Sequence, residues 1–331
     1  MNTSINYPKA SLGFFPTPLV EMKKLSRYLG GPQIWIKRDD QTGLAFGGNK
    51  ARKLEYLLGE ALENGCDCVI TAGAAQSNHC RQTAAGAASL GLGCHLALGG
   101  SAPAIPNGNL LLDELLGAKI YWSGDARKGE LIPEVERKLR ERGFNPFIIP
   151  YGGSNSTGAL GFVAAMEEIN GQFISQNVQA DALIFASSSG ATQAGLMVGN
   201  TFFKSAPAII GVAIDKGEAG EGEFGDRVIQ IANETVVRMG GDPKFKRDDL
   251  ILKEEYVGAG YGVVGDLERE AIRLLAREEG ILLDPVYTAR AFGAMLDLIA
   301  QRKFGRSDTI VFWHTGGTPA LFAYANDFFE S

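Results

Sequence analysis

Short apolar runs rich in β-branched residues alternate with amphipathic stretches along nearly the whole chain. The apolar runs predict strands at residues 34–37, 68–71, 120–122, 147–149, 183–185, 209–214 and 309–313. Apolar residues at helical spacing predict helices at residues 51–63, 82–90, 130–142, 193–203, 267–278 and 289–300. Strands that are apolar throughout and alternate with helices are typical of parallel sheets covered by helices. The pattern therefore predicts an α/β protein built around largely parallel sheets.

The length of 331 residues corresponds to two domains at ~150 residues each. No internal repeat and no linker rich in Pro or Ser divides the chain. The two domains are therefore expected to share the chain through ordinary loops. Residues 215–249, which are rich in charge and glycine, are predicted to form a solvated loop and one helix.

Charge and hydropathy exclude several classes of function. The chain has 32 basic and 38 acidic side chains and a net charge of −6, which argues against a nucleic-acid-binding surface. It contains no run of ~18 apolar residues, so no membrane-spanning segment is expected. Residues 1–20 lack the continuous apolar stretch of a secretory signal. We therefore expect a soluble, cytoplasmic protein.

The cysteines and histidines do not suggest a metal site. Cys66 and Cys68 have no second C-x-x-C or H-x-x-H pair at zinc spacing. A disulfide framework is not expected in a chain of this length without a secretory signal. The four cysteines are therefore predicted to be ordinary small residues, and His314, at the end of an apolar run, to be a buried core histidine.

Glycine clusters follow predicted strands or precede predicted helices. They are GGNK (47–50), GGSN (152–155), SGAT (189–192), GAGYG (258–262) and TGGT (315–318). Such turns let the backbone approach a ligand and aim the N–H groups of a helix N-terminus at an anion. The P-loop, dinucleotide-binding, G-x-S-x-G and H-E-x-x-H patterns are all absent. With these motifs absent, the glycine turns are interpreted as the site of a ligand that carries phosphate and requires one reactive lysine.

Lys50 is the candidate for that lysine, because it follows a glycine pair at the start of a predicted helix. The helix dipole and a dry pocket would both lower the pKa of its ammonium, as covalent catalysis by lysine requires. The alternative is that Lys50, Arg52 and Lys53 form a solvated basic face.

Two polar turns and two tyrosines can each be interpreted as structural or as ligand-binding. Ser77, Asn78 and His79 could cap a helix, grip a carboxylate, or do both. The segment 187–192 (SSSGAT) suits either a helix cap or a cup of N–H donors for phosphate. Tyr261 and Tyr287 lie in predicted loops, where a tyrosine can be a packing lid or can face a substrate.

Taken in order, these segments resemble one family. The motifs are IKRDD (36–40), GGNK (47–50), RKLE (52–55), QSNH (76–79), RQTA (81–84), GGSN (152–155), GALG (158–161), YVGAGYG (256–262), ILLDPVY (281–287) and HTGG (314–317). They resemble the D-cysteine desulfhydrase and 1-aminocyclopropane-1-carboxylate (ACC) deaminase family, which uses pyridoxal 5'-phosphate. The resemblance extends from about residue 16 to residue 324 and favours the chemical interpretation of Lys50.

The resemblance implies a fold, a cofactor and a homodimer. The fold is a two-domain, three-layer αβα arrangement of the tryptophan-synthase-β type (fold type II), with the cofactor in the cleft between the domains. Residues 1–50 plus 165–331 would form the large cofactor-binding domain, and residues 51–164 the small α/β domain inserted in it.

The resemblance also implies roles for individual residues. Lys50 would carry the cofactor and act as the base at Cα, and Ser77 with the N–H groups of Asn78 and His79 would hold the substrate carboxylate. Asn78 would bind the phenolic oxygen of the cofactor. The other implied site residues are Ser189, Gly190, Ala191 and Thr192 around the phosphate, Thr315 near the pyridine nitrogen, and Tyr261 and Tyr287 beside the substrate.

The implied reaction is β-elimination of D-cysteine to pyruvate, hydrogen sulfide and ammonia. ACC deaminases have Glu directly after the tyrosine that matches Tyr287, where this chain has Thr288. A neutral hydroxyl leaves the pyridine ring a weaker electron sink, which favours expulsion of a good leaving group over cyclopropane opening. ACC deamination, L-cysteate sulfo-lyase activity, a binding protein without turnover and a phosphate-ligand binding module stay open as alternatives.

Overall fold

Two sheets form the framework of the chain, and the smaller sheet is inserted in sequence between strands of the larger. The computed structural model describes residues 7–215 and 223–328. The larger sheet has the order β1-β2-β10-β7-β8-β9, and the smaller has the order β5-β4-β3-β6. Neighbouring strands are parallel, except that β1 pairs antiparallel with β2. The strands are β1 (Leu19–Glu21), β2 (Gln33–Arg38), β3 (Cys68–Ala74), β4 (Gly93–Gly99), β5 (Lys119–Trp122), β6 (Pro146–Ile148), β7 (Ala182–Ser187), β8 (Ala208–Ala213), β9 (Ile251–Lys253) and β10 (Thr309–His314).

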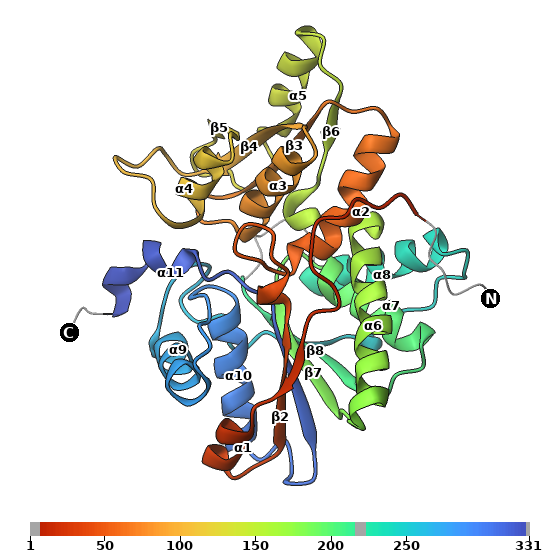
Figure 1. Ribbon diagram of the computed structural model, residues 1–331, viewed down its shortest axis with the longest axis vertical. Coiled ribbons are helices and arrows are strands. Elements are labelled where there is room, and N and C mark those ends of the chain that lie inside the picture. The colour runs from red at the N-terminus through yellow and green to blue at the C-terminus, as the bar shows by residue number, and fades with distance from the viewer. Residues whose placement is uncertain (1–6, 216–222, 329–331) are drawn as a thin grey trace.

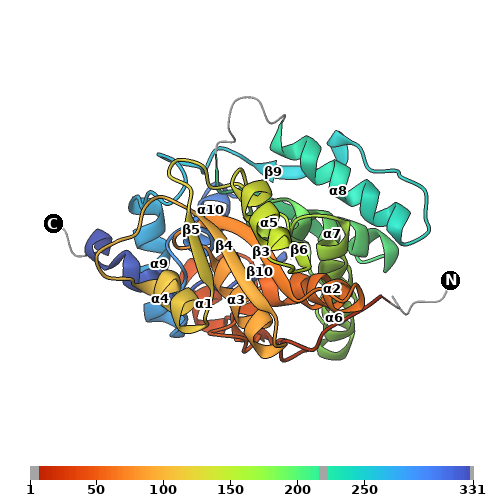
Figure 2. The same ribbon diagram turned by 90° about the horizontal axis from the view of Figure 1, so that it is seen from above.

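Helices cover both faces of each sheet (Figures 1 and 2). Their bounds are α1 (Lys23–Leu29), α2 (Lys50–Glu63), α3 (Asn78–Ser89), α4 (Gly108–Leu115), α5 (Ile132–Glu141), α6 (Ser156–Gln176), α7 (Ala191–Phe202), α8 (Phe224–Arg238), α9 (Asp266–Glu279), α10 (Thr288–Ala300) and α11 (Ala320–Ala323). On the larger sheet, α6, α7 and α8 share one apolar core and α1, α9 and α10 share the other. On the smaller sheet, α2 and α3 pack on one face and α5 on the other. The predicted three-layer α/β fold is confirmed.

All seven predicted strands and all six predicted helices are present, with ends that differ by a few residues. The predictions missed β1, β4, β9 and α1, and also α4, α11 and the long helix α6. The helix expected within residues 215–249 is α8, while residues 216–222 of that segment lie outside the described residues.

The glycines of α6 explain why its pattern was not recognised. A Cβ at Gly158 would lie 2.1 Å from the carbonyl oxygen of Gly153, and a Cβ at Gly161 would lie 2.1 Å from that of Arg52. The first turns of α6 therefore approach the backbone of the preceding turn, at Gly158, and of α2, at Gly161, more closely than any residue with a Cβ allows. Nearly all residues from 157 to 163 are buried, so the segment shows no polar face.

The domain limits stay a prediction. The strands of the smaller sheet lie between residues 68 and 148, and α2 begins at residue 50, where the small domain was expected to start. The other predicted limit, between residues 164 and 165, falls inside α6. This helix packs mainly on the larger sheet and also contacts α2. It is therefore shared by two units, one built on the larger sheet and the other on the smaller sheet.

Several smaller expectations concern single residues and segments. All four cysteines are free, and three of them are buried. No helix among the described residues is long and apolar enough to span a membrane. Within residues 7–215 and 223–328, no cluster of His, Cys, Asp or Glu suits a metal ion. Residues 1–6, part of the segment in which no secretory signal is expected, lie outside the described residues.

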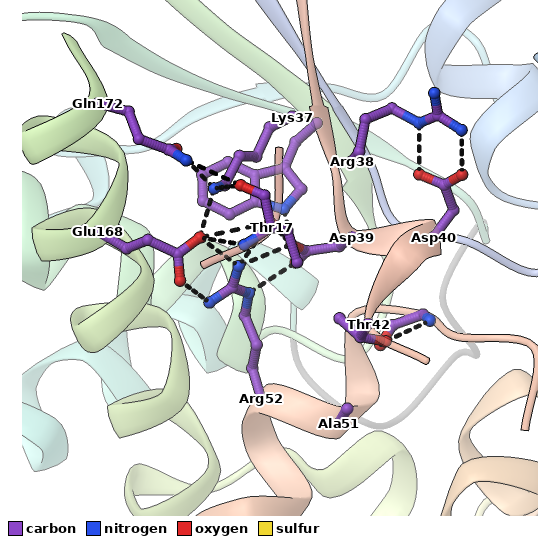
Figure 3. A network of polar contacts seen from close by, with 12 residues as sticks. Thr17, Lys37, Arg38, Asp39, Asp40, Thr42, Ala51, Arg52, Glu168 and Gln172 are labelled. Carbon is purple, nitrogen blue, oxygen red and sulfur yellow. Dashed lines mark hydrogen bonds and ion pairs between the residues drawn. The ribbon is translucent and has the colours of Figure 1, made fainter. Parts of the chain in front are cut away.

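A buried network of charges joins the amino-terminal segment, β2, α2, α6 and β10 (Figure 3). The Arg52 guanidinium donates to both carboxylate oxygens of Asp39 at 2.8 Å and to both of Glu168 at 2.9 Å. The Lys37 ammonium donates to Glu168 and, at 2.6 Å, to the carbonyl oxygen of Thr17. Two cations therefore face two anions in a site that solvent hardly reaches.

The network keeps its carboxylates ionised in spite of burial. Burial alone would raise the pKa of Asp39, but the Arg52 guanidinium and the Trp313 indole N–H hold it below its usual value. The pKa of Glu168 is lowered in the same way by Arg52 and Lys37. Removing one charged side chain from this network is strongly destabilising, because a remaining charge would be buried without its partner.

We expect Arg52→Met to lower the free energy of unfolding by about 3–5 kcal/mol, because it leaves Asp39 with a buried, uncompensated charge. Urea denaturation followed by circular dichroism measures the change. Arg137→Met is the matched control, because Arg137 is exposed and pairs with Glu141 along one helix, an interaction of about 0.3–0.5 kcal/mol. An equal effect of the two substitutions would contradict the importance of the network.

Candidate active site

One cavity lies where the carboxyl ends of strands from both sheets meet. It is lined by residues that follow β3, β7 and β10, and by the start of α2. Ligands of open α/β sheets commonly bind at this edge. The cavity holds about 580 Å³ of space not occupied by atoms, part of it open to solvent. Its described lining is Asn49, Lys50, Ser77, Asn78, His79, Tyr151, Gly152, Ala186, Ser188, Ser189, Gly190, Thr192, Tyr287 and Thr315.

Lys50 is the first residue of α2, and the loop before it is held tightly. Gly47 has a φ of 68°, and a Cβ there would lie 2.0 Å from the carbonyl oxygen of Asp40. The N–H of Gly48 donates to Asp39, and that of Asn49 donates to Thr315. The Lys50 Nζ donates to the carbonyl oxygen of Gly152 at 3.3 Å. Burial lowers the pKa of Lys50 to about 8, so a usable fraction of the amine is neutral near neutral pH.

The alternative of a solvated basic face is wrong. Arg52 is bound in the buried network, and Lys53 is fully buried. The three basic residues thus point into the protein from one helix.

A cup of donors lies at the start of α7. Gly190 has a φ of 101° and is the N-cap residue of the helix, so the N-cap position supplies no side chain to accept the first N–H groups. Ser188, Ser189, Gly190 and Thr192 line the cavity, and the first-turn N–H groups of α7 have no partner within the helix. This arrangement suits a phosphate. Ala191, expected in the same cup, is buried outside the cavity lining, and its N–H lies 3.4 Å from the Ser154 Oγ.

Lys53 is a candidate site residue that the sequence analysis missed. Its Nζ donates to the carbonyl oxygen of Gly152 at 3.1 Å and to the Ser154 Oγ at 3.3 Å. The Ser154 hydroxyl in turn donates to the Ser189 Oγ at 2.7 Å, which connects the lysine to the cup. Burial, with the nearby charge of Lys50, holds the pKa of Lys53 well below its usual value. No carboxylate among the described residues pairs with it, so an anionic ligand would supply the missing counter-charge.

The segment from Ser77 to His79 forms the opposite wall of the cavity. The Ser77 Oγ accepts the N–H of Cys80 at 3.2 Å and caps α3, so the capping interpretation is confirmed. The side-chain Oδ1 of Asn78 accepts from the Asn109 side-chain amide at 2.8 Å, which leaves the side-chain Nδ2 of Asn78 as a donor. Burial holds the pKa of His79 well below its usual value, and its imidazole is therefore neutral.

The two tyrosines contact each other. Their hydroxyl oxygens lie 2.6 Å apart, and their rings meet edge to face at 5.9 Å. Tyr287 lines the cavity, while Tyr261 lies behind it. Burial raises the pKa of both phenols well above the usual value, so both are protonated near neutral pH. Tyr151, which the sequence analysis did not single out, also lines the cavity.

The two threonines differ in their surroundings. Thr315 lines the cavity, whereas the Thr288 hydroxyl donates to Asp284 at 2.6 Å and is not part of the described lining. The described lining contains no Asp or Glu. His314 is fully buried and contacts the carbonyl oxygen of Leu282, in agreement with the expected core histidine.

Residues 10–316 match the family described as pyridoxal-phosphate dependent enzyme. The chain belongs to this family. It is 42% identical over 324 residues to D-cysteine desulfhydrase of Salmonella choleraesuis (strain SC-B67), a match that covers 96% of each chain. It is 36% identical to the crystal structure of an ACC deaminase homologue, with a TM-score of 0.88 over 98% of this chain and 96% of the other. Threonine deaminase isoform 2 of Solanum lycopersicum shares the fold, at 19% identity and a TM-score of 0.61 over 91% of this chain and 79% of the other.

The cavity fits the cofactor of this pyridoxal-phosphate family. The cup at the start of α7 and the buried Lys53 could hold the phosphate, which would compensate a lysine that lacks a carboxylate partner. The Asn78 amide could donate to the phenolic oxygen, and the Thr315 hydroxyl could bind the pyridine nitrogen. Lys50 could supply the amine for covalent attachment, because burial lowers its pKa to about 8.

We expect the rate at which the protein without cofactor binds pyridoxal phosphate covalently to rise with pH and to level off above about pH 8. The neutral amine is the nucleophile, so its fraction grows as pH rises through its pKa. Stopped-flow absorbance between pH 6 and pH 10.5 measures this rate. Lys50→Ala is the control and should show no visible band of covalently bound cofactor. A rate that still climbs at pH 10 would contradict the lowered pKa.

Proposed function

We propose that this pyridoxal-phosphate enzyme eliminates the thiol of D-cysteine and yields pyruvate, hydrogen sulfide and ammonia. One observation carries the proposal: the cavity brings the Lys50 amine together with the Tyr287 phenol, but its described lining has no carboxylate and no arginine. A base and a neutral donor suit the removal of hydrogen and a thiol from adjacent carbons. The name of the Salmonella relative, D-cysteine desulfhydrase, supports the same reaction.

In this proposal each wall of the cavity has its own task. Ser77 and the N–H groups at the start of α3 bind the substrate carboxylate. The Lys50 Nζ takes the proton from Cα, and its lowered pKa makes it an effective base. Pyridoxal phosphate, when bound, supplies a ring that delocalises the charge left at Cα. The buried tyrosine pair excludes water from one side of the cavity.

The bonds balance without an oxidant. Loss of the Cα proton to Lys50 is followed by cleavage of the Cβ–S bond, and the sulfur leaves as hydrosulfide. Tyr287 donates a hydrogen bond to the departing sulfur. The released product, 2-aminoacrylate, reacts with water to give pyruvate and ammonia.

Two related reactions fit the cavity less well. Opening the ring of ACC requires a stronger electron sink, but the described lining has no carboxylate to bind the pyridine nitrogen. At the position where ACC deaminases have Glu, this chain has Thr288, and the Thr288 hydroxyl donates to Asp284. Removal of sulfite from L-cysteate would favour a cation at the leaving group. The Arg127 guanidinium lies near the tyrosine wall, but it pairs with Asp215.

Three further expectations belong to this proposal. The resemblance to the family implies a homodimer, and the composition suggests a cytoplasmic location. The cavity at the edges of both sheets suits the expected division into a large domain and an inserted small domain.

We expect purified holoenzyme to release pyruvate and sulfide from D-cysteine, with little 2-oxobutyrate from ACC and little sulfite from L-cysteate. Lactate dehydrogenase coupling, sulfide trapping and a sulfite assay measure the products. Turnover of ACC or L-cysteate at a higher kcat/KM than D-cysteine would replace the proposed substrate. No product from any of them, with the cofactor bound, would support a binding protein instead.

Ser77→Ala should raise the KM for D-cysteine about 10-fold or more, because a hydrogen bond to a charged group contributes about 1.5–3 kcal/mol. Steady-state kinetics measure KM and kcat. The matched control is Asn155→Ala, which removes the cap of α6 and should cost a similar stability without changing KM. An unchanged KM in Ser77→Ala would contradict the assigned role.

A further inference from the structure

Arg127 connects the two units beside the cavity. It lies in the loop between β5 and α5, and its stem packs on the end of β4, where a Cβ at Gly99 would lie 2.6 Å from the Arg127 Cβ. Its guanidinium forms an ion pair with Asp215, which follows β8 of the larger sheet. Both partners are largely shielded from solvent. The side chain is thus fixed at its stem by one unit and at its head by the other.

The same guanidinium lies over a phenol. The Arg127 Cζ is 4.4 Å from the centroid of the Tyr261 ring. The Tyr261 hydroxyl contacts the Tyr287 hydroxyl at 2.6 Å, and Tyr287 lines the cavity. A continuous path of contacts therefore runs from Asp215 through Arg127 and the two phenols to the substrate cavity.

The cation decides which phenol donates. A positive charge over an aromatic ring is attracted to its electron density and draws on it. The Tyr261 O–H therefore becomes the stronger donor, and its oxygen becomes the poorer acceptor. Either oxygen of the pair could donate, and this effect favours Tyr261 as the donor, which leaves the proton of Tyr287 to point into the cavity.

We infer that Arg127 is a positioning residue for the leaving group: it orients the Tyr261–Tyr287 pair so that Tyr287 donates a hydrogen bond to the departing sulfur. The inference rests on the proposed β-elimination. Asp215 fixes the guanidinium on the ring and balances its charge. Arg127 is not part of the described cavity lining, so it acts through the two phenols.

The dependence on the leaving group tests this role. Hydrosulfide leaves with the help of a donor, whereas chloride leaves without one. Arg127→Met should lower kcat/KM for D-cysteine about 10-fold more than for β-chloro-D-alanine, within the range of a buried cation–π contact. Arg127→Lys, which keeps the charge, should recover part of the difference. Pyruvate formation measures both substrates, and the visible absorbance of the bound cofactor shows that each variant is loaded.

Two comparisons separate this role from a structural one. In the Tyr287→Phe background, Arg127→Met should cause no further change in the ratio between the substrates, because the donor is already absent. Arg137→Met, at an exposed site on α5, should leave kcat/KM unchanged for both substrates.

The outcomes are distinct. Equal losses with both substrates, or no loss in Arg127→Met, would overturn the positioning role while the proposed function stands. If Arg127→Met does not fold, Tyr261→Phe must show the same selective loss with D-cysteine, and equal effects on both substrates would overturn the inference. If wild-type enzyme acts on neither substrate, the proposed function fails first, and the inference fails with it.

Discussion

The buried network around Arg52 is the constraint on which the cavity depends. Arg52 stands two residues after Lys50 on α2, and its guanidinium is bound on both sides, by Asp39 before the glycine loop and by Glu168 on α6. The backbone of Asp39 also accepts the N–H of Gly48, so the network anchors the loop that leads into Lys50. Position and burial of the reactive amine are therefore consequences of a salt bridge outside the cavity.

Burial then determines the chemistry of the cavity. The cost of burying a charge lowers the pKa of Lys50, Lys53 and His79. Lys50 and His79 line the cavity, Lys53 is buried next to Lys50, and the described lining has no carboxylate, so an anionic ligand would favour the protonated form of these basic groups. In the proposed function, the phosphate of the cofactor and the carboxylate of the substrate would do so from different walls of the cavity.

Much of this fold could be predicted from the sequence, because parallel strands buried on both faces give continuous apolar runs. The signal failed where side chains are small and backbones touch, as at Gly158 and Gly161 of α6. Among the site residues, Lys50 and Ser77 follow recognisable turns. Lys53 gave no such signal, because a lysine in a charged run is usually solvated and only the packing of α2 shows that it is buried. Thr288 shows a further limit, since its hydrogen bond to Asp284 depends on the local turn.

The cavity is divided between the two units, and this division explains why contacts across them matter. The start of α3 belongs to the smaller sheet, while the cup of α7, Tyr287 and Thr315 belong to the larger. If a substrate binds both walls, a change in the distance between the walls would weaken its contacts with at least one of them. Near Lys53, the Ser154 hydroxyl, which follows β6 of the smaller sheet, donates at 2.7 Å to the Ser189 Oγ, which follows β7 of the larger sheet. Beside Tyr261 and Tyr287, the ion pair of Arg127 with Asp215 connects the unit of the smaller sheet to the unit of the larger sheet. The two contacts lie on different sides of the cavity, so together they resist rotation of one unit against the other more than either contact could alone.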